Sequence, residues 1–137
     1  GSIMRTADAS GVDGIIIPKH RAVGITPIVV KTSTGAVEHI PVARVTNLTQ
    51  AVQQLKKAGF WIFGTDMSGS DYRTWNAQGA VGLIIGNEGR GMGEGLKKEV
   101  DQMLTIPMTG HVQSLNASVA AGLLMYQAFT SRNGASQ

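Results

Sequence analysis

A glycine-rich stretch at positions 86–93 combines polar groups suited to chemistry with a backbone that a ligand could approach closely. It holds one acid, Glu88, and one base, Arg90, among four glycines in eight positions. Glycine lacks a Cβ, so a loop of this kind can adopt positive φ and expose its amides. The spacing G-x-x-G-x-G reverses the dinucleotide fingerprint, and no Lys-Ser/Thr pair follows to make a phosphate-binding loop. An ordinary tight turn between a strand and a helix is the alternative interpretation.

A second segment, residues 106–116, leads from a strand-like run into a helix-like one. Ser114 and Asn116 stand at the head of the final helix, where exposed backbone N–H groups favour anions or carboxylates. Either residue alone is most simply a helix cap. If the strands that end at Ile85 and Ile106 are neighbours, the two loops form one crevice lined by amides and aliphatic groups. Such a crevice suits a flat adenine with polar appendages better than a bare phosphate.

Apolar and capping patterns predict the elements that position these loops. The apolar run 80–85 indicates a strand buried on both faces, followed at its carboxyl end by the glycine-rich loop. Thr26 followed by Pro27 is typical of a helix start, and Asn47 with Gln50 has capping-box spacing. We expect strands at 14–17, 41–45, 60–63, 80–85 and 103–106, and helices at 26–34, 48–58, 96–100 and 115–129. This alternation predicts an α/β fold, with a mainly parallel sheet flanked by helices.

The composition narrows the class of protein. A chain of 137 residues with 42% hydrophobic and 15% charged residues suits one globular domain. The net charge of +3 permits a polyanionic partner without requiring one. The absence of cysteine excludes disulfides and thiolate metal sites, and no apolar run approaches the roughly 20 residues that span a membrane. We therefore expect a cytoplasmic protein without a membrane or metal site. The helix-like start at residues 3–9 suggests that further residues precede Gly1.

The chain resembles the SpoU-type (TrmH-like) branch of the SPOUT RNA methyltransferases. Residues 86–92, followed by 106–108 and 114–120, are similar to motifs two and three of that family. Residues 2–7 look like the end of motif one, whose preceding asparagine is absent. The motifs occur in the family order and span nearly the whole chain. The segments 11–16 and 38–45 favour the bacterial subgroup that methylates a guanosine ribose in large-subunit (23S) ribosomal RNA.

The resemblance implies S-adenosyl-L-methionine as methyl donor and an RNA ribose 2′-hydroxyl as acceptor. It implies that residues 1–137 are one catalytic domain, with the separate RNA-capturing domain of the subgroup absent. It also implies a C-terminal deep trefoil knot, in which the last segment threads under the loop after Ile85. The family forms homodimers that pack the closing helix across the two-fold axis, which agrees with apolar Leu123, Tyr126 and Phe129.

The resemblance also assigns the site residues. The cofactor site comprises Gly64, Thr65, Gly86, Asn87, Gly89, Ile106, Met108, Ser114 and Leu115. The catalytic residues are Arg5, Glu88, Ser114 and Asn116.

Arg5 has two possible roles in the implied reaction. Arginine is a poor base because its pKa exceeds about 12, so we favour a grip on the adjacent phosphate that also stabilises the developing alkoxide. Arg5 as the proton acceptor is the alternative. Glu88 is expected to orient Arg5 or a water, and Ser114 to bond a ribose or phosphate oxygen. Asn116 holds the loops together or serves only as a helix cap.

Other residues receive simpler interpretations. The three histidines show no metal-site spacing. Trp61 is expected in the core, whereas Tyr72 and Trp75 either stack on bases or pack a long loop. A basic set could contact phosphates or be merely solvated: Lys19, His20, Arg21, Arg44 and Arg90. Rival functions are a transfer-RNA ribose methyltransferase, a nucleotide-dependent oxidoreductase, and a non-catalytic RNA-binding module.

Overall fold

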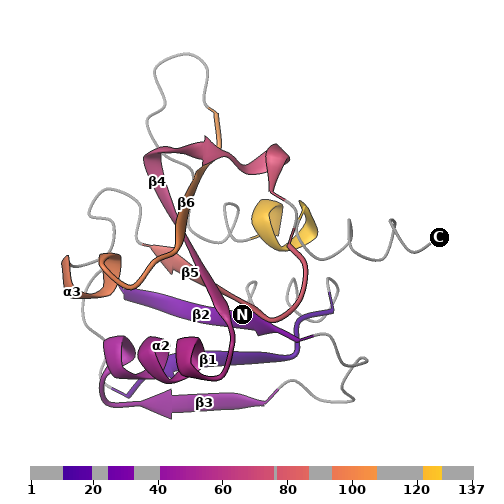
Figure 1. Ribbon diagram of the computed structural model, residues 1–137. Coiled ribbons are helices and arrows are strands. Elements are labelled where there is room, and N and C mark those ends of the chain that lie inside the picture. Colours follow the sequence, from indigo (N-terminus) through magenta and orange to yellow (C-terminus); the bar gives the residue numbers. More distant parts are fainter. Residues whose placement is uncertain are drawn as a thin grey trace.

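A six-stranded sheet organises the part of the chain that the structure describes, in the order β3-β1-β2-β5-β4-β6 (Figure 1). The computed structural model describes residues 11–19, 25–32, 41–75, 77–86, 94–107 and 122–127, with the backbone alone at 25, 26, 66, 67 and 86. The strands are β1 Gly14–Pro18, β2 Ile25–Lys31, β3 Val42–Val45, β4 Trp61–Asp71, β5 Val81–Gly86 and β6 Gln102–Thr105. The helices are α2 Leu48–Lys57, η1 Tyr72–Thr74, α3 Glu94–Lys97 and a helical segment at 122–127.

Three of the strand pairings are parallel, as the α/β prediction requires. β1 runs parallel to β3, and β4 runs parallel to both β5 and β6. β2 is antiparallel to β1 and to β5, and its arrow points opposite to those of β3 and β5 in Figure 1. The mixed α/β class and the mainly parallel sheet are therefore confirmed. The expected knot involves segments after Gly86 and after Pro107 that lie outside the described residues.

The helix expected at 26–34 is wrong, because residues 25–31 form strand β2. The run is rich in β-branched residues, which lose rotamer freedom in a helix and pack well on a pleated surface. Ile28 and Val29 are both fully buried and belong to different hydrophobic clusters, so the strand buries both faces. Pro27 lacks the N–H of a regular ladder, and the β2–β5 register shifts between Ile25 and Ile28 at that point. Pairing with two neighbours outweighs the helix-start signal.

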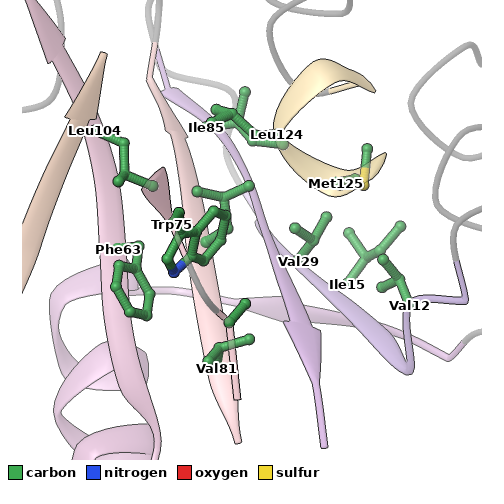
Figure 2. Packing of buried hydrophobic residues seen from close by; sticks show 12 residues of the cluster. Val12, Ile15, Val29, Phe63, Trp75, Val81, Ile85, Leu104, Leu124 and Met125 are labelled. Carbon is green, nitrogen blue, oxygen red and sulfur yellow. The ribbon is translucent and has the colours of Figure 1, made fainter. Parts of the chain in front are cut away.

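Two hydrophobic clusters cover the two faces of the sheet. The larger cluster contains Val12, Ile15, Val29, Phe63, Trp75, Ala77, Val81, Leu83, Ile85, Leu104, Leu124 and Met125. The smaller cluster contains Ile28, Leu48, Val52, Ile62, Ile84 and Leu96. The helical segment 122–127 covers the face of the larger cluster, where Leu124 lies beside Ile85 and Met125 lies on the side of Ile15 (Figure 2). Helices α2 and α3 cover the opposite face.

Strand β5 confirms the expectation of a strand buried on both faces. Val81, Leu83 and Ile85 enter the larger cluster, while Ile84 enters the smaller one. Each of these side chains is at most 2% exposed. The strand is therefore enclosed on both faces up to Ile85 and ends at Gly86.

Helix α2 follows the predicted capping pattern. The side-chain oxygen of Asn47 accepts a hydrogen bond from the backbone N–H of Gln50 at 3.1 Å. Leu48, Ala51 and Val52 face the core, and Gly59 follows the helix with a φ of 98° that suits glycine.

The two tryptophans differ from expectation in their burial, since Trp61 is exposed and Trp75 is in the core. Trp61 is 62% exposed, so its expected core position is wrong. It is the first residue of β4, and the buried part of this strand begins at the next residue, Ile62. Trp75 is 4% exposed and packs against Phe63 with ring centroids 4.6 Å apart (Figure 2). Trp75 therefore packs its segment into the core, and half-buried Tyr72 packs against the same cluster.

Candidate functional site

The carboxyl ends of β4, β5 and β6 form one edge of the sheet, and the chain reverses its winding direction there. The connection from β4 to β5 packs on the face of the larger cluster through Tyr72 and Trp75. The connection from β5 to β6 packs on the opposite face through Leu96 of α3. In open α/β sheets, ligands bind in the crevice outside the strand ends at such a reversal. The three strand ends at this edge, which we call the carboxyl edge, are thus the geometric candidate for a site.

Four residues of the expected cofactor site lie at this carboxyl edge. Gly64 and Thr65 are on β4, Gly86 ends β5, and Ile106 directly follows β6. Gly64 is buried and Thr65 is half-buried. Ile106 is half-buried and packs against the larger cluster. The edge therefore offers an aliphatic wall, one hydroxyl and two positions without a side chain.

The strands that end at Ile85 and Ile106 are not neighbours, so that condition of the sequence interpretation is wrong. β4 lies between them because the crossover that carries the chain from β5 through α3 passes over β4 before β6 joins the sheet. The two strand ends are consequently about two strand spacings, roughly 10 Å, apart. Gly64 and Thr65 of β4 lie in the interval, so residues of three strands, not two, line this edge.

Strand β4 continues past the expected stop at residues 64–66 and reaches Asp71, so that boundary is also wrong. Its pairing with β6 is interrupted there, since Thr65 and Ser70 both pair with Leu104. The four residues between them bulge beside the end of β6. Gly69 closes this bulge against the β6 backbone, where a Cβ would lie 2.6 Å from the carbonyl carbon of Met103. A glycine inside a strand is the sequence signal that could have revealed this close approach.

An ion pair holds the far end of β4. Arg73 donates to Asp71 through its guanidinium at 2.6 Å and through its backbone N–H at 2.9 Å. These hydrogen bonds lower the pKa of Asp71 to about 2. A carboxylate with so low a pKa is a weak base at neutral pH. Asp71 therefore caps η1 and is unsuited to accept a proton from a substrate.

The remaining expected site residues lie outside the described part of the chain. They are Arg5, Asn87, Glu88, Gly89, Met108, Ser114, Leu115 and Asn116. Within the described residues, no group of His, Cys, Asp or Glu is arranged to hold a metal ion, and no helix is long and apolar enough to cross a membrane.

A family model described as the SpoU rRNA Methylase family matches residues 1–126. The chain belongs to this family. A protein of Staphylococcus saprophyticus that is assigned to the TrmH family of tRNA/rRNA methyltransferases is 57% identical over 134 residues. The match covers 97% of this chain and 54% of that relative, so the SpoU-family chain spans about half the length of the curated relatives it matches.

Solved structures show the same fold. The A. aeolicus TrmH/SpoU tRNA modifying enzyme has a TM-score of 0.79 at 27% identity, covering 98% of this chain and 69% of that one. The SpoU methyltransferase AviRb from Streptomyces viridochromogenes, in complex with the cofactor AdoMet, has a TM-score of 0.74 at 31% identity, covering 97% of this chain and 55% of that one. The described part of the SpoU-family chain therefore has the fold of these two enzymes.

Proposed function

We propose that this chain is the catalytic domain of an RNA methyltransferase that uses S-adenosylmethionine to methylate a ribose 2′-hydroxyl. The observation that supports the proposal most is the meeting of four expected cofactor residues at the carboxyl edge. The edge lies where the sheet reverses its winding, in a chain that matches a methylase family over residues 1–126. The AdoMet complex of AviRb, at 31% identity, supports the choice of cofactor.

The carboxyl edge fits the chemistry of an adenosyl group. Ile106 offers an apolar surface for a flat purine, and Thr65 offers a hydroxyl for a polar substituent. Gly64 and Gly86 allow the ligand to approach the backbone closely. Five further residues complete the proposed site: Asn87, Gly89, Met108, Ser114 and Leu115. The proposed trefoil knot brings the segments that carry them to the same edge.

The residues of the chain then have to align and deprotonate the acceptor. When bound, S-adenosylmethionine supplies a methyl group that is already activated on a sulfonium. Arg5 grips the phosphate beside the acceptor ribose and lowers the cost of negative charge on the 2′-oxygen. Glu88 orients Arg5 or a water that takes the hydroxyl proton, and Ser114 bonds a ribose or phosphate oxygen. Asn116 fixes the two loops relative to each other, which preserves the alignment on which the rate depends.

A homodimer is part of the proposal. Leu123 and Tyr126 are 37% and 44% exposed, whereas Leu124 and Met125 of the same helical segment are buried. The exposed pair gives this helix a second apolar face. Packing that face against a second copy of the chain would bury it, and would bring Arg5 of one copy to the cofactor site of the other.

A guanosine of 23S ribosomal RNA is the proposed acceptor, in the cytoplasm. A transfer-RNA ribose is the second candidate, because the A. aeolicus structure with a TM-score of 0.79 is a tRNA modifying enzyme. Mapping of 2′-O-methyl groups in cells that lack the full-length protein separates the two. We expect one 2′-O-methylguanosine to disappear from 23S RNA. Loss confined to transfer RNA would favour the second candidate, and an unchanged pattern in both RNAs would contradict the proposal.

A further inference from the structure

Two exposed basic residues lie at the carboxyl ends of β1 and β3, at the same end of the sheet as the carboxyl edge. Lys19 directly follows β1, and its backbone N–H donates to the carbonyl oxygen of Val45 at 2.7 Å. Arg44 lies on β3, opposite Ile17 of β1. Because β1 and β3 are parallel, the two residues mark the carboxyl ends of both strands.

The strand register places Lys19 in line with Gly86. Ile16 pairs with Ile28 in the antiparallel β1–β2 ladder, so three residues further Lys19 is level with Ile25. Ile25 in turn pairs with Gly86. Lys19 is therefore about two strand spacings, roughly 10 Å, from the end of β5.

Arg44 shares a face of the sheet with the proposed cofactor site. Residues that pair across a sheet point to the same side, so Arg44 lies on the side of Ile17. Ile17 packs against the larger cluster, which also contains Ile85 and contacts Ile106. An extended ligand that lay along the carboxyl edge on this face would pass both basic residues and the ends of β5 and β6.

The charges of Lys19 and Arg44 are not neutralised by their described surroundings. Three other described basic residues have acidic partners: Lys31 with Asp13, Lys56 with Glu99 and Asp101, and Arg73 with Asp71. Lys57 and Lys98, which lie toward the opposite edge of the sheet, have none among the described residues. Among the residues that the structure describes, neither Lys19 nor Arg44 has such a partner. The net charge of the chain is only +3, so its attraction for a polyanion depends mainly on where unpaired cations are placed.

We propose that Lys19 and Arg44 bind backbone phosphates of the RNA that flank the methylated nucleotide. The inference rests on the proposed function for its choice of an RNA ligand. An unpaired cation that binds a phosphate releases counterions, so each contact contributes to affinity and to its dependence on salt. The two residues thus set the direction in which RNA crosses the carboxyl edge, with its acceptor ribose at Gly86.

The test compares two double variants for binding to a short fluorescein-labelled single-stranded RNA of mixed sequence, over a range of salt concentrations. K19Q/R44Q should lower affinity about tenfold or more at low salt. It should reduce the slope of log affinity against log salt by about 1.4, since each contact contributes about 0.7. The matched control is K57Q/K98Q, which removes two exposed lysines, one at the end of α2 and one directly after α3. These helices precede β4 and β6, so both lysines lie toward the amino ends of those strands, away from the carboxyl edge. The control should retain both affinity and slope, and so should the charge-preserving K19R/R44K.

Unchanged affinity and slope in K19Q/R44Q would overturn the inference, as would an equal loss in the control. Each variant is also titrated with S-adenosylmethionine, which should bind all of them like the original chain. A K19Q/R44Q defect in RNA binding alongside a chain that transfers no methyl group would contradict the proposed function while supporting this inference. Normal methyl transfer with unaltered RNA binding in K19Q/R44Q would contradict this inference alone.

Discussion

At Gly69, near the carboxyl edge, the backbone of β6 leaves no room for a side chain. A Cβ there would lie 2.6 Å from the carbonyl carbon of Met103 and 2.7 Å from the backbone nitrogen of Leu104. Backbone atoms of a paired strand cannot move aside as a flexible side chain can. We expect Gly69→Ala to lower the free energy of unfolding by about 1–3 kcal/mol through overpacking, as measured by urea denaturation.

Gly95→Ala is the control for Gly69→Ala. Gly95 lies in α3, and its nearest neighbour to an added Cβ is the Thr49 hydroxyl at 3.9 Å. Alanine has the higher helix propensity, so this variant should be as stable as the original chain or more so. Equal stability of the two variants would show that β4 and β6 are not in close contact at Gly69.

Arg5 carries the proposed contribution to the chemical step. Arg5→Ala should abolish methyl transfer to RNA, because it removes the group that stabilises charge on the 2′-oxygen. The affinity for S-adenosylmethionine should stay within a few-fold, since the proposed grip is on the phosphate. Methyl incorporation and calorimetric titration of the same preparation check the two halves. A large loss of cofactor binding would mean that the role assigned to Arg5 is wrong.

At the scale of elements, the sequence predicts those whose signals are local. Strand β5, with its uninterrupted apolar run, and helix α2, with its cap at Asn47, form where expected. Strand β2 does not, because its identity depends on pairing with β1 and β5, and those contacts outweigh the cap signal at Thr26. Propensity is a weak prior when tertiary contacts compete with it.

In the candidate site, too, some features can be predicted from the sequence and others depend on contacts between distant segments. The family resemblance suggests Ile106 by its motif and Thr65 by its place at a strand end, and both lie at the carboxyl edge. The order of the strands, with β4 between β5 and β6, depends on crossovers between distant segments and leaves no local pattern in the sequence. The bulge after Thr65 depends in the same way on how β4 meets β6.

The cap of α2 gives a test at the element scale. Asn47→Ala removes the acceptor for the Gln50 N–H, which lies 3.1 Å away. The loss should reduce the free energy of unfolding by about 1 kcal/mol. Asn47→Asp keeps the acceptor and should be nearly neutral, as judged by parallel denaturation curves. An Asn47→Ala chain as stable as the Asp variant would show that the hydrogen bond does not stabilise the helix.

At the scale of the whole molecule, the described fold leaves one helix with an apolar face toward solvent. Leu123 and Tyr126 lie on that face, and burial against a second copy is the proposed reason for their exposure. L123S/Y126S should convert the proposed dimer to a monomer at micromolar concentration, as measured by sedimentation equilibrium. L124S, on the buried face, should instead unfold the chain. A wild-type chain that sediments as a monomer would contradict the dimer.

The chain spans about half the length of its curated relatives, at 54%. The carboxyl edge nevertheless lies within the matched residues and within one sheet. We therefore expect this chain to bind the cofactor without any further segment.

Calorimetric titration with S-adenosylmethionine, beside identical titrations with NAD and ATP, tests this cofactor claim most directly. We expect the methyl donor to bind and the two nucleotides not to. Gly86→Val should remain folded by circular dichroism yet lose binding, because its side chain would occupy the space of the ligand at the end of β5. Binding of NAD without S-adenosylmethionine, or undiminished S-adenosylmethionine affinity in Gly86→Val, would contradict the proposed site.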